Sequence, residues 1–268
     1  MLRLGYSQAS DIAYWWFDGY ADFNDMQTPR VRAALAQWFA WNRATQLPEY
    51  ADALARSQTE VLVNSTPERV CEVAAEWRGR IDSAVDRAVP PGAELMLTLT
   101  RAQLQHIERR YAKSNEEFRS DYLQSDPADR IKESVKRTVD RVEMLYGRLD
   151  DAQLAGIKRS MVLSPFDPEL WLAERQRRQQ DVLQMLRKLL ADRAAPEQAR
   201  AALRAHIKQY ERSPRELYRT YNERLWTYNC AFGAALHNSM TTTQRRTAVE
   251  RLKGWESDLR VLAADSVK

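Results

Sequence analysis

The chain has 268 residues, of which 44% are hydrophobic and 29% charged, and its formal net charge is +4. This length allows a full-size buried core, and this composition argues against intrinsic disorder. With only 8 glycines and no run of 18 consecutive apolar residues, the sequence also argues against an all-β fold and against a membrane-spanning helix.

Prolines divide the chain into predicted helices, because proline fits the first turn of a helix and breaks its interior. Seven of the ten prolines stand at predicted helix starts: Pro29, Pro48, Pro67, Pro127, Pro168, Pro196 and Pro214. Several follow a Thr, Asp or Ser, whose short side-chain oxygen can cap the first turn. Of the other three, the adjacent Pro90-Pro91 before Gly92 are expected to form a hinge between two long helices.

A second helix-start signal recurs between these prolines. A hydrophobic residue is followed by a capping residue and, three positions later, by Gln. The pairs are Asn24 with Gln27, Thr100 with Gln103, Asp150 with Gln153, and Thr241 with Gln244. In such a capping box the cap oxygen accepts a backbone N–H, and the Gln side chain accepts the N–H of the cap residue. The pattern therefore predicts helix starts at these motifs, the first of them shared with Pro29.

Apolar residues recur at three- to four-residue steps through the predicted helices, as in Val70, Ala74, Trp77 and Ile81. No segment is predicted to be a strand. The sequence therefore predicts an all-α protein: an irregular multi-helix bundle or stacked helical hairpins, with about ten helices. We expect one domain over residues 1–268, either undivided or with two lobes at about 8–147 and 148–265. When two looser versions of the motif, Thr66 to Arg69 and Ala195 to Gln198, are included, the signals recur every 34 to 50 residues. This spacing leaves an old duplication of helical pairs open.

The run Tyr14-Trp15-Trp16-Phe17, followed by Tyr20, is the most unusual feature of the sequence. Four consecutive aromatic residues cannot all face inward from one helix. Either this helix is buried on several sides, or the run forms an exposed patch that binds a partner, a client protein or a membrane surface.

The positive charge is concentrated in residues 168–219, which contain 12 Lys and Arg against 7 Asp and Glu. A basic helix face is usually only solvated. Its alternative role is to bind an anion, with Arg175, Arg178, Arg187 and Lys188 as candidates. No nucleic-acid partner is expected, because the motifs of RNA- and DNA-binding modules are absent.

Candidate catalytic and metal-binding groups are weak. His106, His206 and His237 fall on three different predicted helices without ligand spacing, and no nucleophile motif or glycine-rich phosphate loop occurs. We therefore expect no enzyme activity, no metal and no cofactor.

Five segments resemble a family of proteobacterial lipoproteins that is known only as a domain of unknown function. These segments are 2–6 (LRLGY), 13–20 (AYWWFDGY), 170–176 (LWLAERQ), 240–244 (MTTTQ) and 258–260 (DLR). In that family a signal peptide ends in a lipidated cysteine just before the first segment, whereas Met1 stands there in this sequence. The resemblance implies that the natural protein has a leader and a lipid anchor. It would then lie on the periplasmic side of a membrane in the bacterial cell envelope.

The helix-start motif with Thr100 and Gln103 is also similar to the repeated motif of Spy-type periplasmic chaperones, helical proteins that hold unfolded clients. The two resemblances together favour a non-enzymatic envelope lipoprotein that binds other proteins, with chaperone-like holding of unfolded clients as one form. The alternative is a structural or assembly factor that recognises one fixed partner or an anionic envelope polymer.

The two cysteines, Cys71 and Cys230, lie on separate predicted helices. In a reducing compartment they would be two buried thiols. In an oxidising periplasm, which the lipoprotein resemblance implies, they could form one disulfide that closes a long loop and contributes about 4–5 kcal/mol.

Overall fold

The computed structural model describes residues 2–264, and for residues 2–4 only the backbone. The fold is all-α, with 85% of residues helical and no strand among those described, as the sequence predicts. The helices are α1 (Leu2–Ser7), α2 (Ala9–Ala21), α3 (Thr28–Trp41), η1 (Asn42–Gln46), α4 (Leu47–Glu60), α5 (Pro67–Met96), α6 (Arg101–Tyr122), α7 (Pro127–Tyr146), α8 (Asp151–Leu163), α9 (Pro168–Ala191), α10 (Pro196–Glu211), α11 (Glu216–Asn238) and α12 (Thr242–Ala264). The π-helical turn η1 joins α3 and α4 without a break. Within residues 2–264, no helix is both long and apolar enough to cross a membrane.

Local side-chain caps explain where the helices begin. Thr66, Asp126 and Asp167 each accept a backbone N–H of the helix that follows, with proline in its first turn. Thr100 and Asp150 form complete capping boxes with the glutamines three residues later. The helix starts predicted at these positions are confirmed.

The hinge expected at Pro90-Pro91 is wrong, because α5 continues through both prolines to Met96. Each proline removes one hydrogen-bond donor from the helix, which disfavours it locally. Tertiary packing stabilises the helix here, since Val89 and Ala93 are almost fully buried and Ala93 packs with Leu189 and Ala199.

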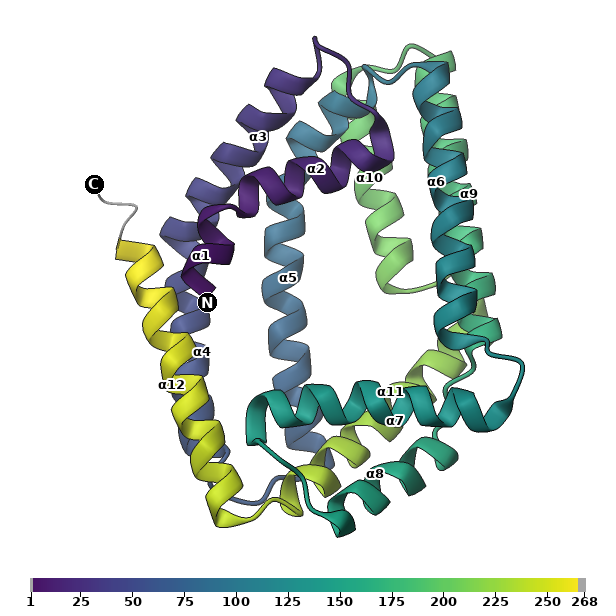
Figure 1. The fold of residues 1–268 in the computed structure, drawn as a ribbon. Coiled ribbons are helices and arrows are strands. Elements are labelled where there is room, and N and C mark those ends of the chain that lie inside the picture. Colours follow the sequence, from purple (N-terminus) through teal and green to yellow (C-terminus); the bar gives the residue numbers. More distant parts are fainter. Residues whose placement is uncertain (1, 265–268) are drawn as a thin grey trace.

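The helices form a closed circuit of neighbouring pairs rather than layers around one core (Figure 1). From α4 the contacts run through α12, α7, α8, α11, α5, α10, α9, α6, α2, α3 and η1, and so back to α4. The buried apolar side chains accordingly fall into several small clusters. The α4–α12 and α5–α11 pairs join residues on both sides of the lobe boundary expected near residue 147.

Two pairs of glutamines lock distant helix starts together. The side-chain amides of Gln27 and Gln103 exchange hydrogen bonds of 3.2 and 2.7 Å, and those of Gln153 and Gln244 exchange bonds of 2.8 and 2.9 Å. All four side chains are buried. Each amide oxygen also accepts the N–H of its own cap residue, and each amide NH₂ group also donates to a backbone carbonyl near the partner glutamine. The same reciprocal bonds join Asn24 and Gln27, but in the turn before α3, which begins only at Thr28 and not directly after Asn24 as predicted. This turn is thus tied to the capping box of Thr100, and the box of Asp150 is tied to that of Thr241.

Candidate binding site

Aromatic side chains are exposed on α2, which packs against α3 on one side and α6 on the other. Trp15 and Trp16 keep 64% and 60% of their surface exposed, and Phe17 keeps 45%. Successive helix residues are turned by about 100°, so the four-residue run covers nearly the whole circumference of α2. We call Trp15, Trp16 and Phe17 the aromatic patch.

Tyr14 does not belong to the aromatic patch, so the buried alternative holds for this member of the aromatic run. It is 7% exposed, and its hydroxyl lies 3.1 Å from Oγ1 of Thr28 on α3. The guanidinium of Arg32 stacks on its ring at 3.9 Å from the centroid. The helical turn places Tyr14 on the side of α2 that faces α3, so it is buried there.

A cavity of about 540 Å³ opens where α2, α6, α9, α10 and α11 converge; we call it the α2–α9 cavity. It brings together the two surfaces that the sequence suggested separately, since Trp16, Phe17 and Tyr20 line it together with Arg175 and Arg178. The other lining residues are Met96, Ile107, Tyr111, Trp171, Glu174, Gln179, Val182, Leu186, His206, Tyr210 and Tyr218. Most of these side chains are apolar or aromatic, as in small-ligand sites generally.

The α6–α9 pair holds Arg175 in place. Its Nε donates to Oδ1 of Asn115 at 3.0 Å, and its Nη2 donates to Oγ of Ser114 at 2.5 Å. Asn115 is itself buried and bonded to Gln179, so the guanidinium is fixed at the cavity wall.

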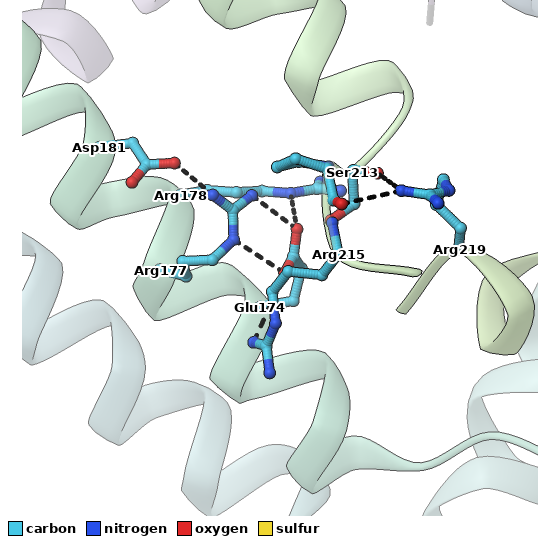
Figure 2. A network of polar contacts seen from close by, with 8 residues as sticks. Glu174, Arg177, Arg178, Asp181, Ser213, Arg215 and Arg219 are labelled. Carbon is cyan, nitrogen blue, oxygen red and sulfur yellow. Dashed lines mark hydrogen bonds and ion pairs between the residues drawn. The ribbon is translucent and has the colours of Figure 1, made fainter. Parts of the chain in front are cut away.

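Arg178 is positioned by Glu174, whose side chain is only 1% exposed (Figure 2). Oε1 of Glu174 accepts hydrogen bonds from Nη2 of Arg177 at 2.8 Å and from Nε of Arg178 at 3.0 Å. Oε2 accepts from Nε of Arg177 at 3.0 Å and lies 3.9 Å from Nη1 of Arg215. A carboxylate so deeply buried is stable only when it is paired in this way.

The surroundings of Glu174 act on its pKa in opposite directions. Burial raises the pKa, but hydrogen bonds from Arg177, Ser213 and Arg178 outweigh burial and lower it to about 2. Glu174 is therefore ionised at neutral pH and neutralises part of the arginine cluster.

The other two members of the predicted basic face lie away from the cavity, near the end of α9. Arg187 pairs with Glu108 at 3.0 Å, and Lys188 pairs with Asp192 at 2.7 Å. Both are exposed, so these ion pairs contribute little stability. The structure therefore does not bring Arg187 and Lys188 together with Arg175 and Arg178 at the cavity, because about 20 Å of helix separates Arg175 from Lys188.

Sequence reasoning missed Glu174, Arg177 and the tyrosines of α10 and α11, Tyr210 and Tyr218. The spacing Glu174-x-x-Arg177-Arg178 places three charges on one helix face and could have indicated the ion-pair cluster. The tyrosines carried no such signal, because they reach the cavity only through the packing of three helices.

Cys71 on α5 and Cys230 on α11 are joined by a disulfide, with their Cα atoms 5.4 Å apart. Cys230 is buried where the two helices pack along each other. The bridge closes a loop of 159 residues and links two elements of the helix circuit.

The charged side chains at the cavity are held in place by their neighbours. In the part of the chain that the structure describes, no three His, Cys, Asp or Glu side chains gather where they could hold a metal ion. The carboxylate in the cavity wall is fully occupied by arginines, and the two positioned guanidinium groups face an aromatic surface.

The fold and this cavity define an all-α protein with an aromatic site that contains two arginines. The chain belongs to a family of unknown function (DUF6279), whose model matches residues 19–212. The matched range includes Tyr20, Arg175 and Arg178, and it ends before α11. No curated protein and no solved structure matches the chain.

Proposed function

We propose that this chain is the folded part of a non-enzymatic cell-envelope lipoprotein that binds other proteins and holds unfolded clients. It would hang on the periplasmic side of a membrane by a lipid anchor on its N-terminal side. The likeness of its helix-start segments to lipoproteins and to Spy-type chaperones supports this location. The Cys71–Cys230 disulfide also supports it, because such bonds persist in oxidising compartments.

The observation that carries the proposal is the large exposed surface of the chain. A compact monomer of 31.1 kDa exposes about 12,000 Å², whereas this chain exposes 16,226 Å². The excess, roughly 4,000 Å², equals the area that large permanent complexes bury between their subunits. It follows from the circuit of helix pairs, in which several helices, such as α9, α10 and α11, pack mainly against two neighbours. This helix circuit therefore leaves enough exposed surface to bind a macromolecular partner.

The aromatic patch indicates that the partner is a protein. Trp, Tyr and Phe are enriched where proteins contact each other, because they bury a large area at a small cost in side-chain entropy. Trp16 contacts Phe17 within the patch and Tyr20 beside it, with ring centroids 5.0 Å apart in both pairs, so these rings form one continuous surface. This surface leads directly into the α2–α9 cavity.

An aggregation assay tests the proposal. At equimolar concentration the wild-type protein should suppress light scattering by unrelated, chemically unfolded clients. The triple variant W15S/W16S/F17S should lose most of this effect. The control is V162S/L163S, which removes two comparably exposed apolar side chains from α8, away from the cavity. Absence of suppression at high excess of the wild type would refute the holding function.

A second function, assembly of one fixed partner, is favoured by the defined cavity with its two positioned guanidinium groups. A preformed site binds one kind of ligand selectively, whereas a surface that holds many unfolded clients does not need to be selective. Cross-linking in envelope extracts separates the two functions. One dominant cross-linked species supports the fixed partner, and many species support general holding.

A further inference from the structure

We infer that the α2–α9 cavity receives an acidic–apolar segment of the bound protein, in which an aromatic or aliphatic side chain lies next to a carboxylate. The apolar side chain would fill the aromatic part of the cavity, and the carboxylate would bind Arg178, with Arg175 beside it. This inference rests on the proposed protein-binding function and specifies which segments the site selects.

Arg178 is the group that points to a carboxylate. Its Nε donates to Glu174, whereas its two terminal nitrogens have no hydrogen-bond partner among the described residues. Its guanidinium lies 4.2 Å from the ring centroid of Tyr210 and 5.4 Å from that of Tyr218, and the side chain is 16% exposed. A guanidinium held flat in this way presents two parallel N–H groups, which match the two oxygens of a carboxylate.

The charge of the cavity wall favours an anion. Its only carboxylate is Glu174, which already has hydrogen bonds from Arg177 and Arg178 and the nearby charge of Arg215. Arg175 has hydrogen bonds only to the neutral Ser114 and Asn115, so its charge is uncompensated by any of these partners. An incoming carboxylate therefore meets net positive charge in a partly desolvated site, where ion pairing is strengthened.

The rest of the wall favours an apolar neighbour for that carboxylate. Trp16, Phe17, Tyr20, Tyr111 and Trp171 face the same space, and the volume of about 540 Å³ lies within the range of small-ligand sites. The exposed aromatic patch continues outward from this wall, so an extended segment can run from the cavity onto α2.

Fluorescence anisotropy with four labelled peptides tests the inference. One peptide carries Trp next to two Asp; the others replace the Asp residues by Asn, the Asp residues by Lys, or the Trp by Ser. The wild-type protein should bind the Trp–Asp peptide roughly tenfold more tightly than the Trp–Asn peptide, as expected for a charge-assisted pair. The Lys and Ser peptides should bind more weakly still.

Two variants locate the effect. R178Q should bring the Trp–Asp and Trp–Asn peptides to equal affinity while it still binds both through the apolar residue. R187Q removes an exposed arginine of the same helix outside the cavity and should keep the tenfold preference. Because R178Q also loses a bond to Glu174, its fold is checked by circular dichroism. W16S, on α2, provides an independent variant that should weaken the binding of both peptides equally.

Equal wild-type affinity for the Asp and Asn peptides would overturn the inference. If the wild type still suppresses aggregation in that case, the proposed protein-binding function stands. Equal peptide affinities together with no suppression of aggregation would refute both the inference and the proposed function. Direct binding of decanoate, measured by calorimetry, with no binding of any peptide would show that the cavity takes a small amphipathic acid, and would overturn the polypeptide assignment.

Discussion

The two interlocked glutamine pairs make a quantitative prediction about stability. Besides a weak bond to Sδ of Met240 at 3.7 Å, the Gln153 side chain takes part in four hydrogen bonds: from Asp150 N at 3.0 Å, to Ser239 O at 2.9 Å, and two with the Gln244 amide. Gln244 takes part in four bonds of the same kind, with Thr241 N and Arg148 O at the outer ends. The test replaces each glutamine by alanine, singly and together.

The expected size of the effect follows from counting bonds. At about 1 kcal/mol net for each hydrogen bond, either single variant should lower the free energy of unfolding by about 4 kcal/mol. The double variant loses the two bonds between the amides only once, so it should lose about 6 kcal/mol rather than about 8. The coupling between the two positions is then about 2 kcal/mol.

Urea denaturation followed by circular dichroism at 222 nm measures all four corners of this cycle. Q198A is the control. Gln198 forms the same type of bond to the N–H of its cap residue, Ala195, at 2.8 Å, but it is exposed and has no partner glutamine. It should cost about 1 kcal/mol or less. Additive losses for Q153A and Q244A, with coupling below about 0.5 kcal/mol, would show that the two amides do not act as a unit.

Three further predictions concern the disulfide, the buried carboxylate and a close helix contact. The variant C71S/C230S should be less stable than the wild type by up to about 5 kcal/mol, because the disulfide closes a loop of 159 residues and so restricts the unfolded chain. Intact mass and thiol titration of wild-type protein expressed in the periplasm should show no free thiol. The pKa of Glu174 is lowered to about 2, so the free energy of unfolding of the wild type should fall by about 3 kcal/mol as the pH drops from about 4.5 towards 2. E174Q should be less stable than the wild type at pH 7 and should lack this part of the acid dependence. G233A should destabilise the protein by about 1–3 kcal/mol, because its Cβ would lie 3.2 Å from a methyl group of Val70 on α5. The control G79A meets nothing within 4 Å and should stabilise the protein slightly. Equal melting temperatures for the two glycine variants would contradict this prediction.

Short motifs in the sequence were enough to locate where most helices begin. A cap such as Thr100 and its glutamine interact within four residues of chain, so the bond that starts the helix is visible as a short motif. The same holds for Asp167 before Pro168. The local rule was wrong at Pro90-Pro91, where buried neighbours from α9 and α10 outweigh the helix-breaking tendency of proline.

Part of the candidate site was also visible in the sequence. Four consecutive aromatic residues exceed what a helix with few neighbours can bury, and α2 indeed leaves Trp15, Trp16 and Phe17 exposed. A basic segment was evident too, but composition could not separate Arg175 and Arg178 from residues three turns further along α9.

What these features contact depends on the three-dimensional packing of the helices. Gln27 meets Gln103 across 76 residues of chain, and Cys71 meets Cys230 across 159. The α2–α9 cavity is likewise assembled from helices that are distant in sequence. Each of these contacts depends on how the helix circuit closes, which is set by the sum of many weak packing interactions along all its helices rather than by any short motif. The helix starts are therefore determined locally by the sequence, whereas the surface that the helices present depends on the whole helix circuit.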